Sequence, residues 1–141
     1  MAKENNLERF VKAQQTDFQT ALSEIKNGQK RSHWMWYIFP QIKGLGFSST
    51  SVFYSLENIR EAEEFINHPI LGDRLLLICN ELLKLKGNDA YQIFGSPDDL
   101  KLKSSMTLFS SLPKADLVFQ LVLDKFYTGT KDSKTLKIIG G

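Results

Sequence analysis

The chain has 141 residues, of which 42% are hydrophobic and 24% are charged, as is typical of one folded domain with its own core. The formal net charge is only +2, and no basic run is longer than Lys30-Arg31, so nucleic acid is not expected as a partner. The polar N-terminus has no signal-peptide pattern, and no apolar run reaches the roughly 18 residues that a membrane span needs. We therefore expect a cytoplasmic protein that does not bind membranes.

The cysteine and histidine pattern argues against disulfides and metal sites. The single cysteine, Cys79, has no internal partner and lies in the apolar run LLLICNELL, which predicts a buried and inert thiol. The two histidines, His33 and His68, belong to no H-E-x-x-H or C-x-x-C pattern. We expect no metal site and no cofactor.

Hydrophobic periodicity and the turn residues predict helices joined by short connections. In chain order, helical patterns cover 7–25, 33–39, 51–54, 56–67, 70–87, 90–95, 100–112 and 114–129, with a last short turn over 135–139. Valine is sparse, whereas Leu, Lys and Glu are abundant, which also favours helix. The sequence therefore predicts an all-α fold, a compact single-domain bundle of seven or eight mostly short helices over 1–141.

Two boundaries in the first part of the chain are less regular. Thr16 and Gln19 resemble a capping box, which is compatible with a break into two helices near residues 14–16. Ser32 is placed to cap a short helix over 33–39, which ends at a proline. This run is apolar on every side, so it is expected to be buried.

The stretch KRSHWMWYIFP contains both tryptophans of the chain beside two cations, and it supports two interpretations. In a ligand pocket, Trp34 and Trp36 offer stacking surface and His33 offers a proton donor or acceptor. Lys30, with Ser32 and the free amides at the start of the helix, offers contacts to an anion. In a core helix, the same indoles and imidazole are instead satisfied by backbone carbonyls.

The stretch PDDLKLKSSMTLF is a second candidate. Lys101 and Lys103 can bind an anion, while Ser104 or Ser105 with Lys101 has the spacing of a nucleophile and its base. Solvated lysines on a helix that packs through its apolar residues, with Asp98 or Asp99 as ion-pair partners, are the simpler interpretation. Nothing in the sequence shows a desolvated lysine. The sequence therefore leaves open whether the protein is an enzyme.

The segment FYTGTKDSKT supplies one more candidate residue. Asp132 can orient an imidazole or a hydroxyl group of a ligand site. The same aspartate can equally cap the last helical turn, and we favour this capping role.

Four stretches resemble a known family: RFVKAQ (9–14), KRSHWMWYIFPQIKGLGFS (30–48), HPILGDRL (68–75) with IFGSPDDLKLKSSMTLF (93–109), and VLDKFYTGTKDSKT (122–135). Together they are similar to the bacterial proteins of domain-of-unknown-function family 1810. The resemblance implies a compact helical bundle, but no established activity. The label calpastatin-like, which such proteins sometimes carry, is misleading, since a calpain inhibitor of that kind is disordered and this composition is that of a folded chain.

Two functional hypotheses follow. In the first, the protein binds a small anionic metabolite or nucleotide in a pocket lined by the HWMW and KLKSSMT motifs. The candidate ligand-binding residues are Lys30, Ser32, His33, Trp34, Trp36, Lys101, Lys103, Ser104 and Asp132. In the second, the motifs are structural, and an apolar surface patch binds a protein partner. The first hypothesis requires His33, a tryptophan and a motif lysine to converge on one cavity.

Overall fold

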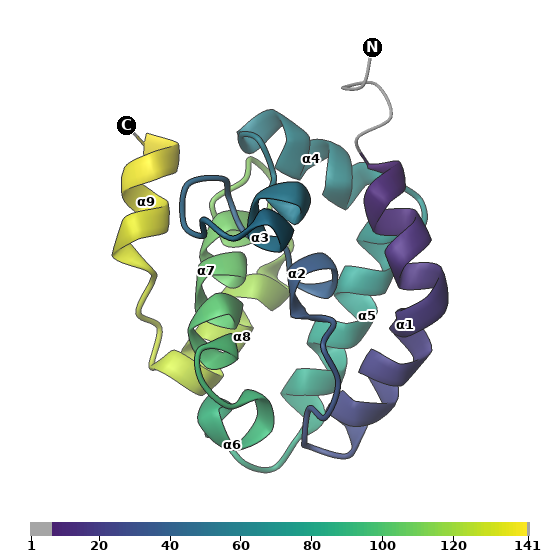
Figure 1. Ribbon diagram of the computed structural model, residues 1–141. Helices are drawn as coiled ribbons and strands as arrows, with labels where there is room; N and C mark the ends of the chain where they lie inside the picture. The colour runs from purple at the N-terminus through teal and green to yellow at the C-terminus, as the bar shows by residue number, and fades with distance from the viewer. Residues whose placement is uncertain (1–6, 141) are drawn as a thin grey trace.

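The computed structural model describes residues 7–140, and within this range the regular structure is helical apart from one isolated β-bridge (Figure 1). The helices are α1 (Glu8–Lys26), α2 (Met35–Ile38), α3 (Ser49–Tyr54), α4 (Ile59–Asn67), α5 (Leu71–Lys84), α6 (Ala90–Phe94), α7 (Asp98–Ser110), α8 (Leu117–Tyr127) and α9 (Ser133–Gly140). The predicted all-α class is confirmed. The described residues form nine helices rather than seven or eight, since the tail forms a helix where the sequence predicts only a turn.

The helix α1 runs without a break, so the capping-box reading of Thr16 is wrong. The buried stripe of α1 continues through this region because Gln14 is buried there, and its side-chain amide donates to the carbonyl of Tyr37 at 2.7 Å. The helix ends at Asn27, as the sequence predicts, and Gly28 follows with φ +76°. This is the left-handed conformation that glycine adopts without strain.

The longer helices pack around a shared core. The helix α5 contacts both α1 and α8, α7 packs against α8, and α9 contacts α7 on the side of the molecule away from α1 (Figure 1). The chain turns tightly between α4 and α5: a side chain at Gly72 would place its Cβ 2.0 Å from the carbonyl oxygen of Ile66. Only glycine fits at this close approach of the two helices.

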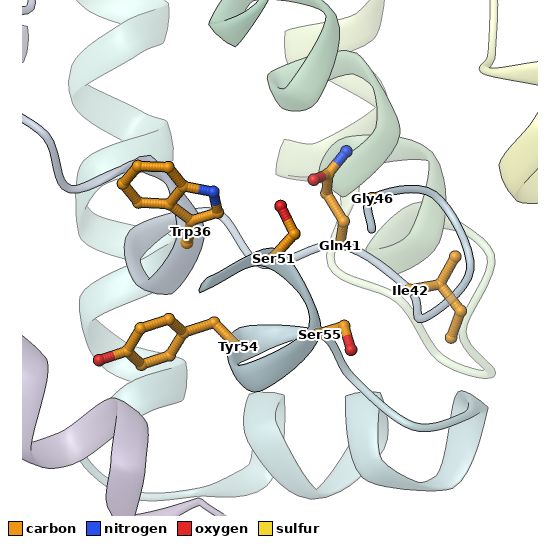
Figure 2. A pocket seen from close by; sticks show the side chains of 7 residues that line it. All are labelled: Trp36, Gln41, Ile42, Gly46, Ser51, Tyr54 and Ser55. Atoms are coloured by element: carbon orange, nitrogen blue, oxygen red, sulfur yellow. The ribbon is translucent and has the colours of Figure 1, made fainter. Parts of the chain in front are cut away.

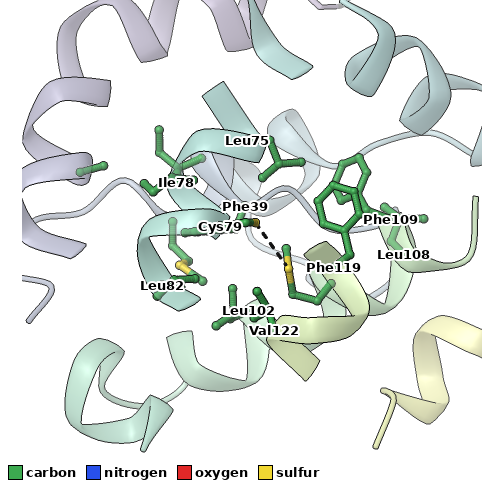
Figure 3. Packing of buried hydrophobic residues seen from close by; sticks show 14 of the residues in the cluster. Phe39, Leu75, Ile78, Cys79, Leu82, Leu102, Leu108, Phe109, Phe119 and Val122 are labelled. Carbon is green, nitrogen blue, oxygen red and sulfur yellow. Dashed lines mark hydrogen bonds between the residues drawn. The ribbon is translucent and has the colours of Figure 1, made fainter. Parts of the chain in front are cut away.

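The buried hydrophobic side chains between Phe10 and Phe126 form one cluster, part of which Figure 3 shows. Cys79 lies inside this cluster with its sulfur 3.7 Å from that of Met106, so the prediction of a buried thiol is confirmed. Burial, together with the charge of Asp116, raises the pKa of the thiol far above its ordinary value. None of the helices in residues 7–140 is both long and apolar enough to span a bilayer.

The segment between α1 and α4 contains the first of the two predicted motifs. Of the helix that the sequence predicts over 33–39, only the four residues of α2 are helical. The chain then passes through the bridge between Ile42 and Leu56, which encloses α3 in a loop. Short elements of this kind are held by side-chain contacts rather than by helix propensity, because four residues are too few to form a stable helix alone.

Candidate functional site

A pocket of about 390 Å³ lies between the segment that joins α1 to α2 and the start of α7. Its lining residues are Lys30, Arg31, Ser32, His33, Trp36, Phe94, Ser96, Pro97, Asp98 and Lys101. Five predicted site residues are among them, and they come from both motifs. The volume falls within the range of small-molecule pockets, roughly 300 to 1,000 Å³. The structure thus meets the geometric condition of the first hypothesis, because His33, a tryptophan and a motif lysine converge on one cavity.

Glu24 organises the segment that forms one wall of the pocket. From α1, its carboxylate accepts hydrogen bonds from the backbone N–H groups of Arg31 and Ser32 at 2.8 and 3.1 Å. It also accepts from the Ser32 hydroxyl at 2.6 Å and from the indole Nε1 of Trp34 at 2.8 Å. The prediction that Ser32 caps α2 is therefore wrong, since its hydroxyl bonds to Glu24 and α2 begins after Trp34. The amides of Arg31 and Ser32, just before the predicted helix, are occupied by this carboxylate.

The same contacts set the pKa of Glu24. Burial alone raises a carboxyl pKa, but here the hydrogen bonds from Ser32, Arg31 and Trp34 outweigh it. The pKa of Glu24 falls from 4.5 to about 2. Glu24 is therefore ionised at every physiological pH, and the segment it holds stays in place.

Lys30 connects this segment to α7. Its ammonium group lies 2.9 Å from Asp98 Oδ2 and bonds to the carbonyl of Ser32. It also sits over the ring of Trp34, 5.0 Å from the ring centroid. The Lys30 side chain is only 7% exposed. The nearly buried ammonium group is thus engaged by one carboxylate, one carbonyl and one aromatic face.

Lys101 faces the same pocket from α7 but has fewer polar contacts than Lys30. It lies 3.5 Å from Asp98 Oδ1, beyond normal hydrogen-bond length, and 4.8 Å from the ring centroid of Trp36. The Lys101 side chain is 21% exposed. With one long ion pair and one aromatic face as its partners, Lys101 keeps donors that a ligand can use.

The two tryptophans differ in their access to the pocket. Trp34 is 1% exposed and does not line it, so its indole belongs to the core and its N–H to Glu24. Trp36 is partly buried and lines the pocket with the ring that faces Lys101. Each indole carries a lysine ammonium over one face, so these aromatic rings hold cations rather than standing free to stack a base.

The N–H edge of Trp36 points the other way. It faces a cavity of about 10 Å³ whose lining includes Gln41, Ser51 and Tyr54, as Figure 2 shows. Among residues 7–140, the buried Nε1 atom of Trp36 finds no hydrogen-bond acceptor. The cavity is no larger than one water molecule, so it is no site for a metabolite.

Two further predicted residues on α7 lie outside the pocket lining. The ammonium of Lys103 sits over the ring of Tyr127, 5.8 Å from its centroid. Ser104 is buried, and its hydroxyl donates to the carbonyl of Leu100 at 3.2 Å. This backbone contact is the usual arrangement of a serine inside a helix and does not pair Ser104 with a base.

Asp132 also lies apart from the pocket, at the start of α9. Its carboxylate accepts from the backbone N–H of Thr135 at 2.9 Å and from the hydroxyl of the same residue at 2.6 Å. Its own N–H donates to Thr107 Oγ1 at 2.9 Å. Asp132 therefore caps α9 and fixes it against α7, which is the capping role favoured by the sequence.

Sequence reasoning missed the parts of the pocket that come from other elements. Asp98 is noticed in the sequence as a helix-start residue and an ion-pair partner, but not as a link between both motifs. Glu24 gives no signal at all, because it lies on the polar side of α1 and meets Ser32 only after the chain turns back. Phe94 at the end of α6 reads as an ordinary apolar residue.

A second pocket of about 400 Å³ lies between α4, α5 and α8, and its lining contains none of the predicted site residues. In the described part of the chain, no group of three or more His, Cys, Asp and Glu side chains is close enough to hold a metal ion.

Comparison with known proteins adds a family and a solved structure. A family model described as a protein of unknown function (DUF1810) matches residues 4–139. The chain is similar to the conserved hypothetical protein Rv1873 from Mycobacterium tuberculosis, whose crystal structure is known. The sequence identity is 40%, the match covers 96% of this chain and 97% of that chain, and the TM-score is 0.94. No curated protein matches the sequence.

Proposed function

The chain belongs to the DUF1810 family, and from the geometry of its pocket we propose that it binds a small anionic metabolite or nucleotide there. The observation that supports this most directly is the convergence of Lys30, Ser32, His33, Trp36 and Lys101 on one cavity. These residues come from stretches about seventy positions apart in the sequence. These stretches meet only when the whole chain is folded, whereas a chance surface cluster of cations needs no such arrangement.

The charges of the lining favour an anion. Lys30, Arg31 and Lys101 contribute three positive charges and Asp98 one negative charge, so the lysine, arginine and aspartate side chains of the lining sum to two positive charges. Phe94, Pro97 and the ring of Trp36 provide apolar surface beside them. Such a lining suits a ligand with one anionic group and a less polar body.

The three cations play different parts. Lys30 is nearly buried and paired with Asp98, so it stabilises the wall and contributes through its charge. Arg31 is exposed, with one contact of 3.4 Å between its guanidinium and the side chain of Gln29. Arg31 and Lys101 are thus the groups that would contact the anion directly, with His33 as a hydrogen-bonding neighbour. The proposed function is binding, and no reaction is assigned.

The test is a ligand screen with two matched variants. Wild type, Lys101→Met and Lys103→Met are screened by thermal unfolding against nucleotides, phosphorylated metabolites and carboxylic acids. Both lysines lie on α7 above an aromatic ring, but only Lys101 lines the pocket. A ligand at about 100 times its dissociation constant stabilises the fold by about 2.7 kcal/mol. For a chain of this length, that raises Tm by several degrees.

We expect at least one anionic class to raise the Tm of wild type and of Lys103→Met, with the shift lost or strongly reduced in Lys101→Met. If no compound shifts wild type, or if both variants lose the shift equally, the pocket does not bind anions in this way.

A second candidate function, docking of a protein partner, is favoured by a different surface. Phe47 is 86% exposed, and Val52 and Phe53 on the following α3 are 47% and 57% exposed. Exposed aromatic side chains in one short segment are typical of interaction sites. A double Phe47→Ser, Phe53→Ser variant tests this candidate: it abolishes capture of a protein partner and leaves the ligand screen unchanged.

A further inference from the structure

One carboxylate lies between the two lysines of the pocket. Asp98 Oδ2 is 2.9 Å from the Lys30 ammonium, and the other oxygen, Oδ1, is 3.5 Å from the Lys101 ammonium. All three side chains are mostly shielded, since Asp98 is 18% exposed and the lysines less than a quarter. The protein therefore supplies an anion of its own at the position between the two cations.

This carboxylate cannot easily leave when a ligand arrives. Lys30 is nearly buried, and without Asp98 its charge would keep only the carbonyl of Ser32 and the face of Trp34 as partners. Breaking such a shielded pair is costly, because it leaves a desolvated charge without a counter-ion. A bound anion must therefore contact Lys101 and Arg31 while Asp98 stays beside it.

The retained carboxylate acts on any ligand within a few ångströms. Two like charges that close repel strongly in a partly shielded site, even at an effective dielectric constant near 20. An ionised carboxylate has about four acceptor positions; Lys30 uses one on Oδ2, whereas Lys101 lies too far from Oδ1 for a normal hydrogen bond. An O–H or N–H group next to the anionic group of a ligand would offset the repulsion by donating to a remaining position.

We propose that Asp98 makes this pocket selective for anions that carry a hydroxyl or amino donor beside the charged group, the class of sugar and polyol phosphates. This inference rests on the proposed function, since it concerns the same pocket. Asp98 is its specificity-determining residue: it rejects anions without such a donor and accepts those that have one.

The experiment compares two phosphate monoesters of the same charge and the same three-carbon skeleton. Glycerol 3-phosphate has two hydroxyl groups and n-propyl phosphate has none. Their affinities are measured by calorimetry for wild type, Asp98→Asn and the control Asp99→Asn. Asp99 is the next residue of the same helical turn and does not line the pocket, and its Oδ1 accepts from the N–H of Leu100. The control removes the same formal charge from the neighbourhood.

For wild type and Asp99→Asn, we expect glycerol 3-phosphate to bind about tenfold more tightly than n-propyl phosphate, as for one hydrogen bond to a charged group. In Asp98→Asn, n-propyl phosphate gains affinity and the preference shrinks to a few-fold at most, because the repulsion is gone while the amide oxygen still accepts from Lys30. Equal affinities in wild type overturn the inference without any variant, and so does a preference that survives in Asp98→Asn.

The two proposals fail in different ways. If other anions from the ligand screen bind through Lys101 but wild type does not prefer glycerol 3-phosphate to n-propyl phosphate, selectivity by Asp98 is wrong and anion binding stands. If no anion in the screen binds, both proposals are wrong.

Discussion

Two lysine–tryptophan pairs flank the pocket, and they differ in what surrounds them. The Lys30 ammonium lies 5.0 Å from the centroid of Trp34, and that of Lys101 lies 4.8 Å from Trp36, so the pairs have nearly the same geometry. The first pair is buried, and its lysine contacts Asp98 and Ser32, whereas the second is half-open and its lysine has only one long ion pair. Two tryptophans only two positions apart, each paired with a lysine, thus form a structural wall in one case and a surface available to a ligand in the other. What separates them is Glu24, which bonds to the indole of Trp34 only.

The largest effect is expected from truncating the two indoles. Trp34→Ala should lower the free energy of unfolding by about 3 to 5 kcal/mol, because it empties a fully buried site. Trp36→Ala should lower it by roughly 1 to 2 kcal/mol, since Trp36 is only partly buried. Urea unfolding of both variants measures the difference. Equal losses would show that the two indoles have the same structural role and would break the comparison.

A smaller effect is expected from removing each ammonium group. Lys30→Met should reduce the free energy of unfolding by about 2 kcal/mol, because it removes a shielded hydrogen-bonded charge while Asp98 keeps Lys101 as its partner. Lys101→Met should cost less than about 1 kcal/mol, as for a partly exposed ion pair. The comparison uses the same urea titration, with Lys103→Met as a reference. A larger loss for Lys101→Met than for Lys30→Met would reverse our assignment of the two lysines.

A pH-dependent effect is expected at the carboxylate that distinguishes the pairs. The pKa of Glu24 is lowered to about 2, so its contribution to stability is complete above the ordinary value of 4.5 and is lost as the pH falls toward 2. Glu24→Gln keeps an acceptor oxygen and should lower the free energy of unfolding at pH 7 by about 1 to 2 kcal/mol. The measurement is urea unfolding between pH 7 and pH 2.5.

The matched control for this titration is Glu64→Gln, which changes a carboxylate on the exposed side of α4 that lies 3.8 Å from Arg60. In Glu24→Gln, the difference from wild type should shrink below pH 4.5, where wild type loses the same contribution. The control should differ little from wild type at any pH. A difference for Glu24→Gln that is constant down to pH 2.5 would contradict the lowered pKa.

Comparison of particular elements shows how much of the fold could be predicted. Helices α5 and α8 follow directly from their apolar periodicity, and α4 ends at His68-Pro69 as the sequence predicts. The prediction over 33–39 is correct in type but too long, because these residues are held by Glu24 and by core contacts rather than by helical hydrogen bonds. The start of α4 at Ile59, capped by Asn58, rather than just after Ser55 reflects the bridge at Leu56, which no local pattern indicates.

Only part of the candidate site could be predicted, again because local patterns do not indicate contacts between distant segments. Residue types identify which stretches carry unusual chemistry, and Lys30, His33, Trp36 and Lys101 do line one pocket. Residue types do not reveal direction: Lys103 is two positions from Lys101 and points to Tyr127 instead. On a helix, such a step turns the side chain by about 200°, so only the placement of α7 in the bundle decides which lysine faces the pocket.

The sequence by itself determined the all-α class, the family and the two stretches that meet at the pocket, because periodicity, caps and rare motifs are local properties. Only the tertiary structure decided that one tryptophan is buried and the other open, and that Asp98 joins both lysines. It also decided that Glu24, on the polar side of α1, shapes the pocket wall. These contacts join residues that are distant in sequence or separated by a turn of the chain. Their geometry depends on how the helices pack, which no local pattern encodes.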